Sequence, residues 1–373
     1  MGLVCLAGLG VWTIRHPVTA FAYGPLIAFA LLNFVLGNRA VFYSAPILWF
    51  GAAYLVTCTT RFVTQAFQSK GEDAIQSTGM SQTASISGVS LAMAIAWVNA
   101  QTDYVPHPSF PKPVLEGMIK LNSIAASHPS VVASWWDYGY ASLFFNDLPT
   151  LHDGGNQIDP TTYFIARALL TSNQKELVGT LKLLASSGNA GIERFTTKAA
   201  LYDAIETVPA DPSPDIYLIL TNQMAGWIGS ISKLGNWDIE TGEALTPKNN
   251  NGKTYVDYIG LDCNYRNFPI KVACGNVSFN FDRGLMNNSP AIVGWTLARD
   301  GFAEDVRRYR ADATFGVQIL QTNNQLSSQL MHRQLYDSSF NKLYHLGLIE
   351  APGITLVYDD YPHIRIYRIV GKD

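Results

Sequence analysis

The chain has 373 residues, of which 15% are charged and 12% are aromatic, and its formal net charge is −3. Charged residues make up about a quarter of an ordinary globular chain, so this chain is poor in charge. The near-neutral balance provides no basic field for phosphate groups, which excludes a nucleic-acid partner.

Apolar stretches dominate the first hundred residues. A helix that crosses a bilayer needs about 20 apolar residues, and the stretches at 18–37 and 40–58 come close to that length. Shorter or more polar stretches lie at 1–14 and 84–101. We therefore predict a membrane α-helical bundle of about four helices over residues 1–101. The alternative is a set of helices buried in a globular core.

Basic residues in the short loops predict how this bundle is oriented. Arg15 and His16 lie in one loop, and Arg61 and Lys70 lie in the loop before the last stretch. Positively charged loops face the cytoplasm. Residues 102–373 are then expected outside the cytoplasm, as the periplasmic part of a multi-pass protein of the inner (cell) membrane.

Residues 102–373 have the pattern of a mixed α/β exterior domain. The run 215–220 is predicted to be a buried strand, the run 225–233 a helix, and the spacing of apolar residues predicts one long helix over 161–185. Turn signals between short β-type runs predict a β-rich insertion at about 238–290.

Two of the four cysteines, Cys263 and Cys274, lie in this predicted insertion. In an oxidising compartment they could form a disulfide that closes a small loop. The alternative is a pair of free, buried thiols, and the spacing alone does not decide between the two.

A compact aromatic and acidic motif, Trp-Trp-Asp-Tyr-Gly, occupies residues 135–139. A carboxylate and an indole N–H can both hydrogen-bond a small hydroxyl group, while flat indole rings exclude water around it. Such a pocket rejects a ligand that lacks the hydroxyl, because its own polar groups would stay unpaired. The structural alternative is an aromatic core cluster in which Asp137 caps the following helix.

Together with the run from Thr150 to Gly155, which contains Asp153-Gly-Gly, this motif resembles the signature of the oligosaccharyltransferase catalytic subunits. The likeness is to the C-terminal part of the bacterial single-subunit enzymes. The family moves a glycan from a polyprenyl diphosphate lipid to the Asn of Asn-x-Ser/Thr. The resemblance implies that this part of the chain binds the acceptor sequence, through Trp135, Trp136, Asp137 and Tyr138.

Two further residues gain a role from the same resemblance. Met224, in Met224-Ala-Gly-Trp227, falls where the bacterial enzymes carry Met-x-x-Ile and would contact the methyl group of the acceptor threonine, although Trp227 replaces the isoleucine. Arg39 matches an arginine that holds the lipid diphosphate, for which a guanidinium fork is well suited. Read alone, Met224 is a core residue and Arg39 an interfacial arginine.

The resemblance also implies a divalent cation, Mg²⁺ or Mn²⁺, held by acidic residues upstream of the matching part. The first acidic residue of this chain is Glu72, so the ligands are not expected in this chain, and neither are the catalytic residues. We expect that the chain alone is incomplete and does not catalyse.

The sequence thus predicts a glycosyltransferase of protein N-glycosylation. Its expected partners are a polyprenyl-diphosphate-linked glycan, an acceptor polypeptide with Asn-x-Ser/Thr, and the membrane. Two alternatives stay open. One is a non-catalytic membrane-anchored peptide-binding module, and the other is a polyprenyl-phosphate glycosyltransferase with a non-protein acceptor.

Overall fold

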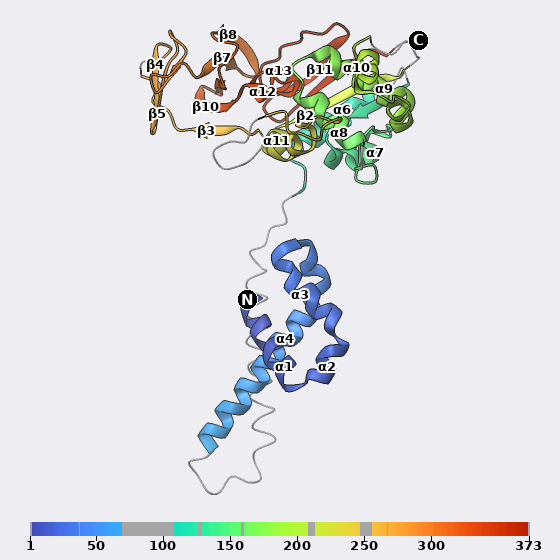
Figure 1. The fold of residues 1–373 in the computed structure, drawn as a ribbon, viewed down its shortest axis with the longest axis vertical. Helices are drawn as coiled ribbons and strands as arrows, with labels where there is room; N and C mark the ends of the chain where they lie inside the picture. Colours follow the sequence, from blue (N-terminus) through green and yellow to red (C-terminus); the bar gives the residue numbers. More distant parts are fainter. Residues whose placement is uncertain are drawn as a thin grey trace. The chain divides into compact units, whose positions relative to one another are not determined.

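The chain divides into two compact units, Met1–His107 and Pro108–Asp373, as drawn in Figure 1. The computed structural model describes residues 2–36, 38–68, 108–125, 129–157, 160–207, 213–246, 256–266 and 268–371. Each unit has a hydrophobic core of its own, and the second unit has two.

The first unit consists of helices in its described part: α1 Gly2–Arg15, α2 Pro17–Ala22, α3 Gly24–Leu36 and α4 Asn38–Gln68. Helices α1 and α4 pack closely through two glycines. A Cβ atom on Gly8 would lie 2.6 Å from the carbonyl carbon of Gly51, so no larger residue fits there without movement of the backbone.

The predicted membrane bundle is wrong. None of the helices in the described ranges is both long and apolar enough to cross a membrane. Proline and glycine at the helix boundaries divide the first part into helices of 14, 6 and 13 residues, whereas a crossing needs about 20. Helix α4 has 31 residues, but its apolar sequence gives way to a polar run at 57–61. The stretch expected at 84–101 lies outside the described residues.

The second unit is built on a four-stranded sheet with the order β1-β2-β12-β11. Its strands are β1 Ser130–Ala133, β2 Asp215–Thr221, β12 Ile364–Ile369 and β11 Ile354–Asp360. Strands β1 and β2 are parallel, whereas β12 is antiparallel to both of its neighbours. Every residue of β2 is buried, as expected for an inner strand with both faces covered.

Helices surround this sheet: α6 Lys112–Ala125, η1 Trp136–Tyr138, α7 Gly139–Asn146, α8 Thr161–Leu170, α9 Gln174–Glu193, α10 Lys198–Glu206, α11 Asn222–Gly235, α12 Arg333–Tyr336 and α13 Ser339–Tyr344. Gly117 of α6 lies against Ile364, while Tyr367 donates a hydrogen bond of 2.7 Å to the Leu343 carbonyl of α13. Side chains alternate along a strand, so α6 and α13 cover opposite faces of β12.

The single helix predicted over 161–185 is two helices. Helix α8 ends at Leu170, and α9 begins at Gln174. The Asn173 side chain accepts a hydrogen bond of 3.0 Å from the Lys175 backbone N–H and so caps the second helix. The apolar spacing runs through both helices and does not reveal this break.

The β-rich part continues well beyond residue 290. A five-stranded sheet has the order β3-β10-β9-β7-β8, and a three-stranded sheet has the order β4-β5-β6. In Figure 1 this part, in orange, lies at the opposite end of the second unit from α9 and α10. The strands are β3 Ile259–Leu261, β4 Lys271–Cys274, β5 Val277–Asn280, β6 Leu285–Met286, β7 Ile292–Arg299, β8 Phe302–Arg308, β9 Phe315–Thr322 and β10 Gln325–His332.

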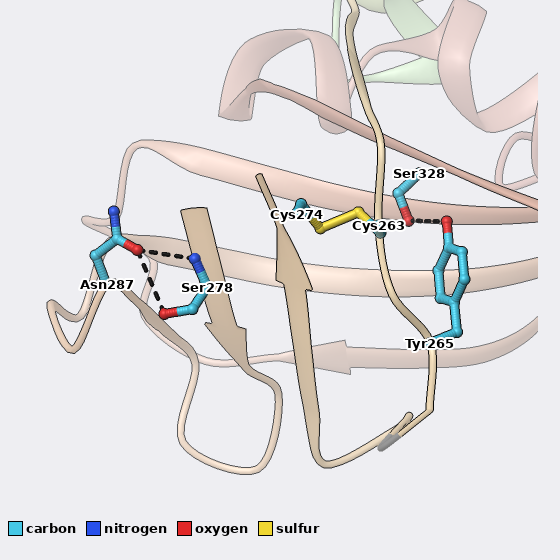
Figure 2. Close-up of a disulfide and its surroundings, with 6 residues drawn as sticks. All are labelled: Cys263, Tyr265, Cys274, Ser278, Asn287 and Ser328. Atoms are coloured by element: carbon cyan, nitrogen blue, oxygen red, sulfur yellow. Dashed lines mark hydrogen bonds between the residues drawn. A yellow bond between two sulfur atoms is a disulfide. The ribbon is translucent and has the colours of Figure 1, made fainter. Parts of the chain in front are cut away.

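Cys263 and Cys274 form a disulfide, which decides between the two alternatives that the sequence leaves open. Figure 2 shows it joining the segment after β3 to the end of β4. Close by, the Tyr265 and Ser328 hydroxyls share a hydrogen bond of 2.8 Å. The disulfide and this bond attach the three-stranded sheet and the segment after β3 to β10.

Arg365, the second residue of β12, connects the two parts of the second unit. Its guanidinium is completely buried and forms a two-point ion pair with Asp359 of β11, at 2.9 and 3.0 Å. It also donates to the carbonyls of Gly301, in the turn between β7 and β8, and Tyr344, at the end of α13, at 2.6 and 3.0 Å. One side chain thus joins the first sheet to the β-rich part and to α13.

We predict that Arg365→Ala lowers the free energy of unfolding by about 3 kcal/mol, because it leaves the Asp359 carboxylate without its partner and the carbonyls without donors. Urea unfolding of the full chain measures the change. Arg299→Ala is the matched control, because Arg299 pairs with Glu304 at the surface and such a pair contributes less than about 1 kcal/mol. Equal effects of the two substitutions would contradict the prediction.

Candidate functional site

The Trp-Trp-Asp-Tyr-Gly motif lies at the carboxyl end of a strand. Strand β1 ends at Ala133 and leads through Ser134 into the motif, while the neighbouring parallel strand β2 ends at Thr221 and leads into α11. The carboxyl ends of parallel strands meet at one edge of a sheet, where open α/β folds bind their ligands. The fold therefore brings the motif and the start of α11 together.

The first four of the five motif residues divide between the core and the surface. Trp135 is 3% exposed, and its ring packs edge-to-face on His152 with the ring centres 5.3 Å apart. Trp136 and Asp137 are half-buried and border a pocket. Tyr138 is fully buried. Of these four residues, only Trp136 and Asp137 can therefore contact a ligand from solvent without rearrangement.

Tyr138 connects the two loops at this edge of the sheet. Its hydroxyl donates a hydrogen bond of 2.6 Å to the Gln223 side-chain oxygen, and it shares a bond of 2.7 Å with the Thr221 hydroxyl. Its ring packs against Trp227, with the ring centres 6.0 Å apart. Burial raises the pKa of Tyr138, so the hydroxyl keeps its proton and remains a donor. Tyr138 therefore links the segment after β1 to the start of α11.

Met224 lies beneath the motif rather than beside the pocket. It is fully buried, and its sulfur is 3.6 Å from the Ser134 hydroxyl. Its backbone N–H donates to the Thr221 hydroxyl, which caps α11. Trp227, three residues further along α11, lines the pocket instead.

The pocket has a volume of about 510 Å³, and its walls are mainly aromatic. Among the residues that line it, Asp137 is the single carboxylate. Two large side chains of α7, Tyr140 and Phe144, extend the wall and are 59% and 82% exposed. One carboxylate in a mainly apolar pocket suits a ligand with a hydroxyl group and apolar surface.

The Asp-Gly element after the motif has a structural role. The Asp153 carboxylate accepts hydrogen bonds of 2.7 and 2.8 Å from the backbone N–H groups of Gly155 and Asn156. This closes a turn that packs on the start of α7. A Cβ atom on Gly139 would lie 2.5 Å from the Asp153 Cα and 2.6 Å from the His152 carbonyl oxygen, so the approach requires glycine.

Comparison with known proteins supports one family. Residues 128–189 match the STT3/PglB/AglB core domain, a segment that holds β1, the motif and α8. A dolichyl-phosphooligosaccharide-protein glycotransferase of Methanocaldococcus jannaschii is 26% identical over 204 residues, covering 44% of this chain and 21% of that protein. An undecaprenyl-diphosphooligosaccharide–protein glycotransferase of Campylobacter jejuni is 23% identical over 164 residues, covering 44% and 22%.

The fold agrees with these sequence matches. The crystal structure of the C. jejuni PglB C-terminal domain aligns with a TM-score of 0.51 at 15% identity, covering 69% of this chain and 99% of that domain. The second unit is thus similar in sequence and fold to the C-terminal part of the oligosaccharyltransferases, which are glycosyltransferases. The chain spans about a fifth of the length of the two curated relatives above.

The cation that the oligosaccharyltransferase family implies has no evident site in the described part of the chain. No three His, Cys, Asp or Glu side chains there are grouped so that they could hold a metal ion. The described residues therefore do not form a site that fits such an ion. Arg39, the expected diphosphate ligand, belongs to α4, and its side chain lies outside the described part.

Most residues that line the pocket were not expected from the sequence to contact a ligand, among them Phe110, Tyr140 and Phe144. Tyr140 and Phe144 are four residues apart on α7 and so share one face of the helix. That spacing was a usable signal. No sequence signal indicated Phe110, because its contact with the motif depends on how the segment before α6 packs in the tertiary structure.

We predict that Gly139→Ala lowers the free energy of unfolding by about 2 kcal/mol, because the added methyl group meets backbone rather than a movable side chain. Gly226→Ala is the matched control. Gly226 is also helical, and nothing lies within 4 Å of an added Cβ, so this change should stabilise α11 by roughly 0.5–1 kcal/mol. Thermal and urea unfolding measure both, and an unchanged stability of Gly139→Ala would refute the close approach.

We also predict an acid-dependent loss of stability from His152. Burial lowers the pKa of His152 to about 4, although the charge of Asp153 acts in the opposite direction. The unfolded chain, with a histidine pKa of about 6.5, then binds a proton that the folded chain does not. The stability that the neutral ring contributes is complete above about pH 6.5 and is lost as the pH falls towards 4.

Between pH 7 and pH 5, this residue should therefore cost the wild type about 2 kcal/mol of unfolding free energy. Urea unfolding at the two pH values measures the difference. The His152→Gln variant should lose correspondingly less over the same interval. An identical pH dependence of the two proteins would contradict the assignment.

Proposed function

We propose that the second unit of this chain recognises the acceptor sequence of a protein N-glycosylation reaction, Asn-x-Ser/Thr. In this proposal the complete protein transfers an oligosaccharide from a polyprenyl diphosphate lipid to the asparagine amide. The observation that carries the proposal is the pairing of Trp136 and Asp137 at the edge of a pocket, within the segment that matches the family's core domain.

The proposed recognition rests on the chemistry of the acceptor hydroxyl. A threonine or serine O–H would donate to the Asp137 carboxylate, while Trp136 and Trp227 shield that hydrogen bond from water. A peptide without the hydroxyl would cover the carboxylate without giving it this hydrogen bond, which is the stronger source of selectivity. Trp135 and Tyr138 would act indirectly, by fixing the loop that presents these two residues.

For Met224 and Arg39 the proposal is more specific. Met224 would support the floor of the pocket, because it is fully buried beneath Ser134, and Trp227 would provide the apolar contact to a threonine methyl group. Arg39 would bind the lipid diphosphate, for which a guanidinium is well suited. We further propose that the second unit works outside the cytoplasm, which is supported by the Cys263–Cys274 disulfide.

The test compares two peptides that differ only at the residue two positions after asparagine, with threonine in one and valine in the other. The two side chains have nearly the same shape, so the comparison isolates the hydroxyl group. We predict that the full chain binds the threonine peptide roughly tenfold more tightly, and that Asp137→Asn removes most of this difference. Fluorescence anisotropy of labelled peptides measures both.

Asp147→Asn is the matched control, because Asp147 ends α7 and is not among the residues that line the pocket. This variant should keep the full preference for threonine. The proposal fails if wild type binds the two peptides equally, or if Asp137→Asn and Asp147→Asn discriminate equally well. A full preference without glycan transfer by the complete protein would instead support a peptide-binding module.

A further inference from the structure

A second, larger cleft lies in the same unit, and its walls are rich in arginine. It has a volume of about 610 Å³, within the range typical of small-ligand sites. Its lining combines side chains from α8 with others from the ends of β8 and β10 and the start of α12. The polar groups that matter here are Arg167, Arg308, Arg310, Arg333, His332 and Gln334, and we call this the arginine cleft.

Three of the four guanidinium groups are neutralised within the protein. Arg167 pairs with Glu176 at 3.1 Å, and Arg308 pairs with Asp337 at 2.5 Å. Arg310 forms a two-point pair with Asp312, at 3.0 and 2.9 Å. These contacts hold the arginines in place and leave further N–H groups on each of them, since a guanidinium has five donors.

Arg333 is the exception. Its guanidinium donates to the backbone carbonyl of Ala311, a neutral acceptor. Its charge acts on Asp312, whose pKa it helps to lower, but that carboxylate already forms the two-point pair with Arg310. Among the described residues, the four guanidinium groups of the cleft thus share three paired carboxylates, which leaves an excess of positive charge.

Besides its positive charge, the cleft contains a hydrogen-bond donor, His332, and a hydrogen-bond acceptor, Gln334. The ring of His332 accepts a hydrogen bond of 3.2 Å at Nδ1 from the Gln334 backbone N–H. Burial, and then the charge of Arg333, lower the pKa of His332, so the neutral ring carries its proton on Nε2 as a donor. The side-chain oxygen of Gln334 is buried and has no hydrogen-bond partner within the described part of the chain.

From this arrangement we propose that the arginine cleft binds a small hydroxylated oxyanion, a sugar that carries a carboxylate or a phosphate group. The oxyanion would accept hydrogen bonds from Arg333 and Arg310, the groups with charge and geometry for it. A hydroxyl group of the sugar would donate to the Gln334 oxygen, which otherwise bears the cost of an unmade hydrogen bond. The proposal does not depend on the function proposed for the Asp137 pocket.

The experiment is a calorimetric titration of the full chain with three probes: glucuronate, glucose 6-phosphate and glucose. We expect at least one acid to bind, and glucose to bind at least roughly tenfold more weakly than that acid. Binding of glucuronate alone identifies a carboxylate site, and binding of glucose 6-phosphate alone identifies a phosphate site. The proposal is overturned if neither acid binds more tightly than glucose.

Substitutions then locate the binding. Arg333→Gln and Arg310→Gln should each weaken binding of the acid by roughly tenfold, whereas Arg299→Gln, a surface arginine outside the cleft, should leave it unchanged. Urea unfolding of each variant shows whether it is folded. If the folded Arg333→Gln and Arg310→Gln variants bind as tightly as Arg299→Gln, the oxyanion lies elsewhere and the assignment is wrong.

Discussion

The buried guanidinium of Arg365 is the interaction on which the arrangement of the second unit depends. It lies on β12, and it pairs with Asp359 on β11 while donating to carbonyls of the β7–β8 turn and of α13. A buried charge is tolerated only when its donors are satisfied. Meeting that requirement brings the two sheets and the helical layer into one defined arrangement. Gly301 takes part in it, because a Cβ atom there would lie 2.5 Å from a guanidinium nitrogen.

This arrangement has consequences at the opposite edge of β2. Strand β12 lies beside β2, and β2 lies beside β1, so the positions of Thr221 and Ala133 follow from the position of the anchored strand. Tyr138 then joins the two carboxyl ends through its hydroxyl group. The motif therefore has two buried structural residues and two residues that line the pocket. Trp135 and Tyr138 fill the core, and that packing is what presents Trp136 and Asp137 to the pocket.

Much of the second unit could be predicted from local sequence. The all-apolar centre of 215–220 is the buried strand β2, and 225–233 lies within α11, because each run carries a clear period. The membrane bundle was wrong because apolar composition does not show where helices break, and Pro17 and Gly24 begin new helices. The break between α8 and α9 was missed for a related reason. It depends on a capping asparagine in an otherwise continuous apolar pattern.

The sequence by itself determined the chemical character of the motif, the family that it resembles and the strands that form the centre of the α/β sheet, because these depend on residue type and local spacing. Only the tertiary structure decided that Met224 is buried while Trp227 lines the pocket, that Cys263 bonds to Cys274, and that four arginines from separate elements share one cleft. These outcomes depend on how the helices and strands pack against one another in three dimensions. Such contacts are set by packing and by the pairing of buried polar groups, and the spacing of apolar residues along the sequence does not reveal them.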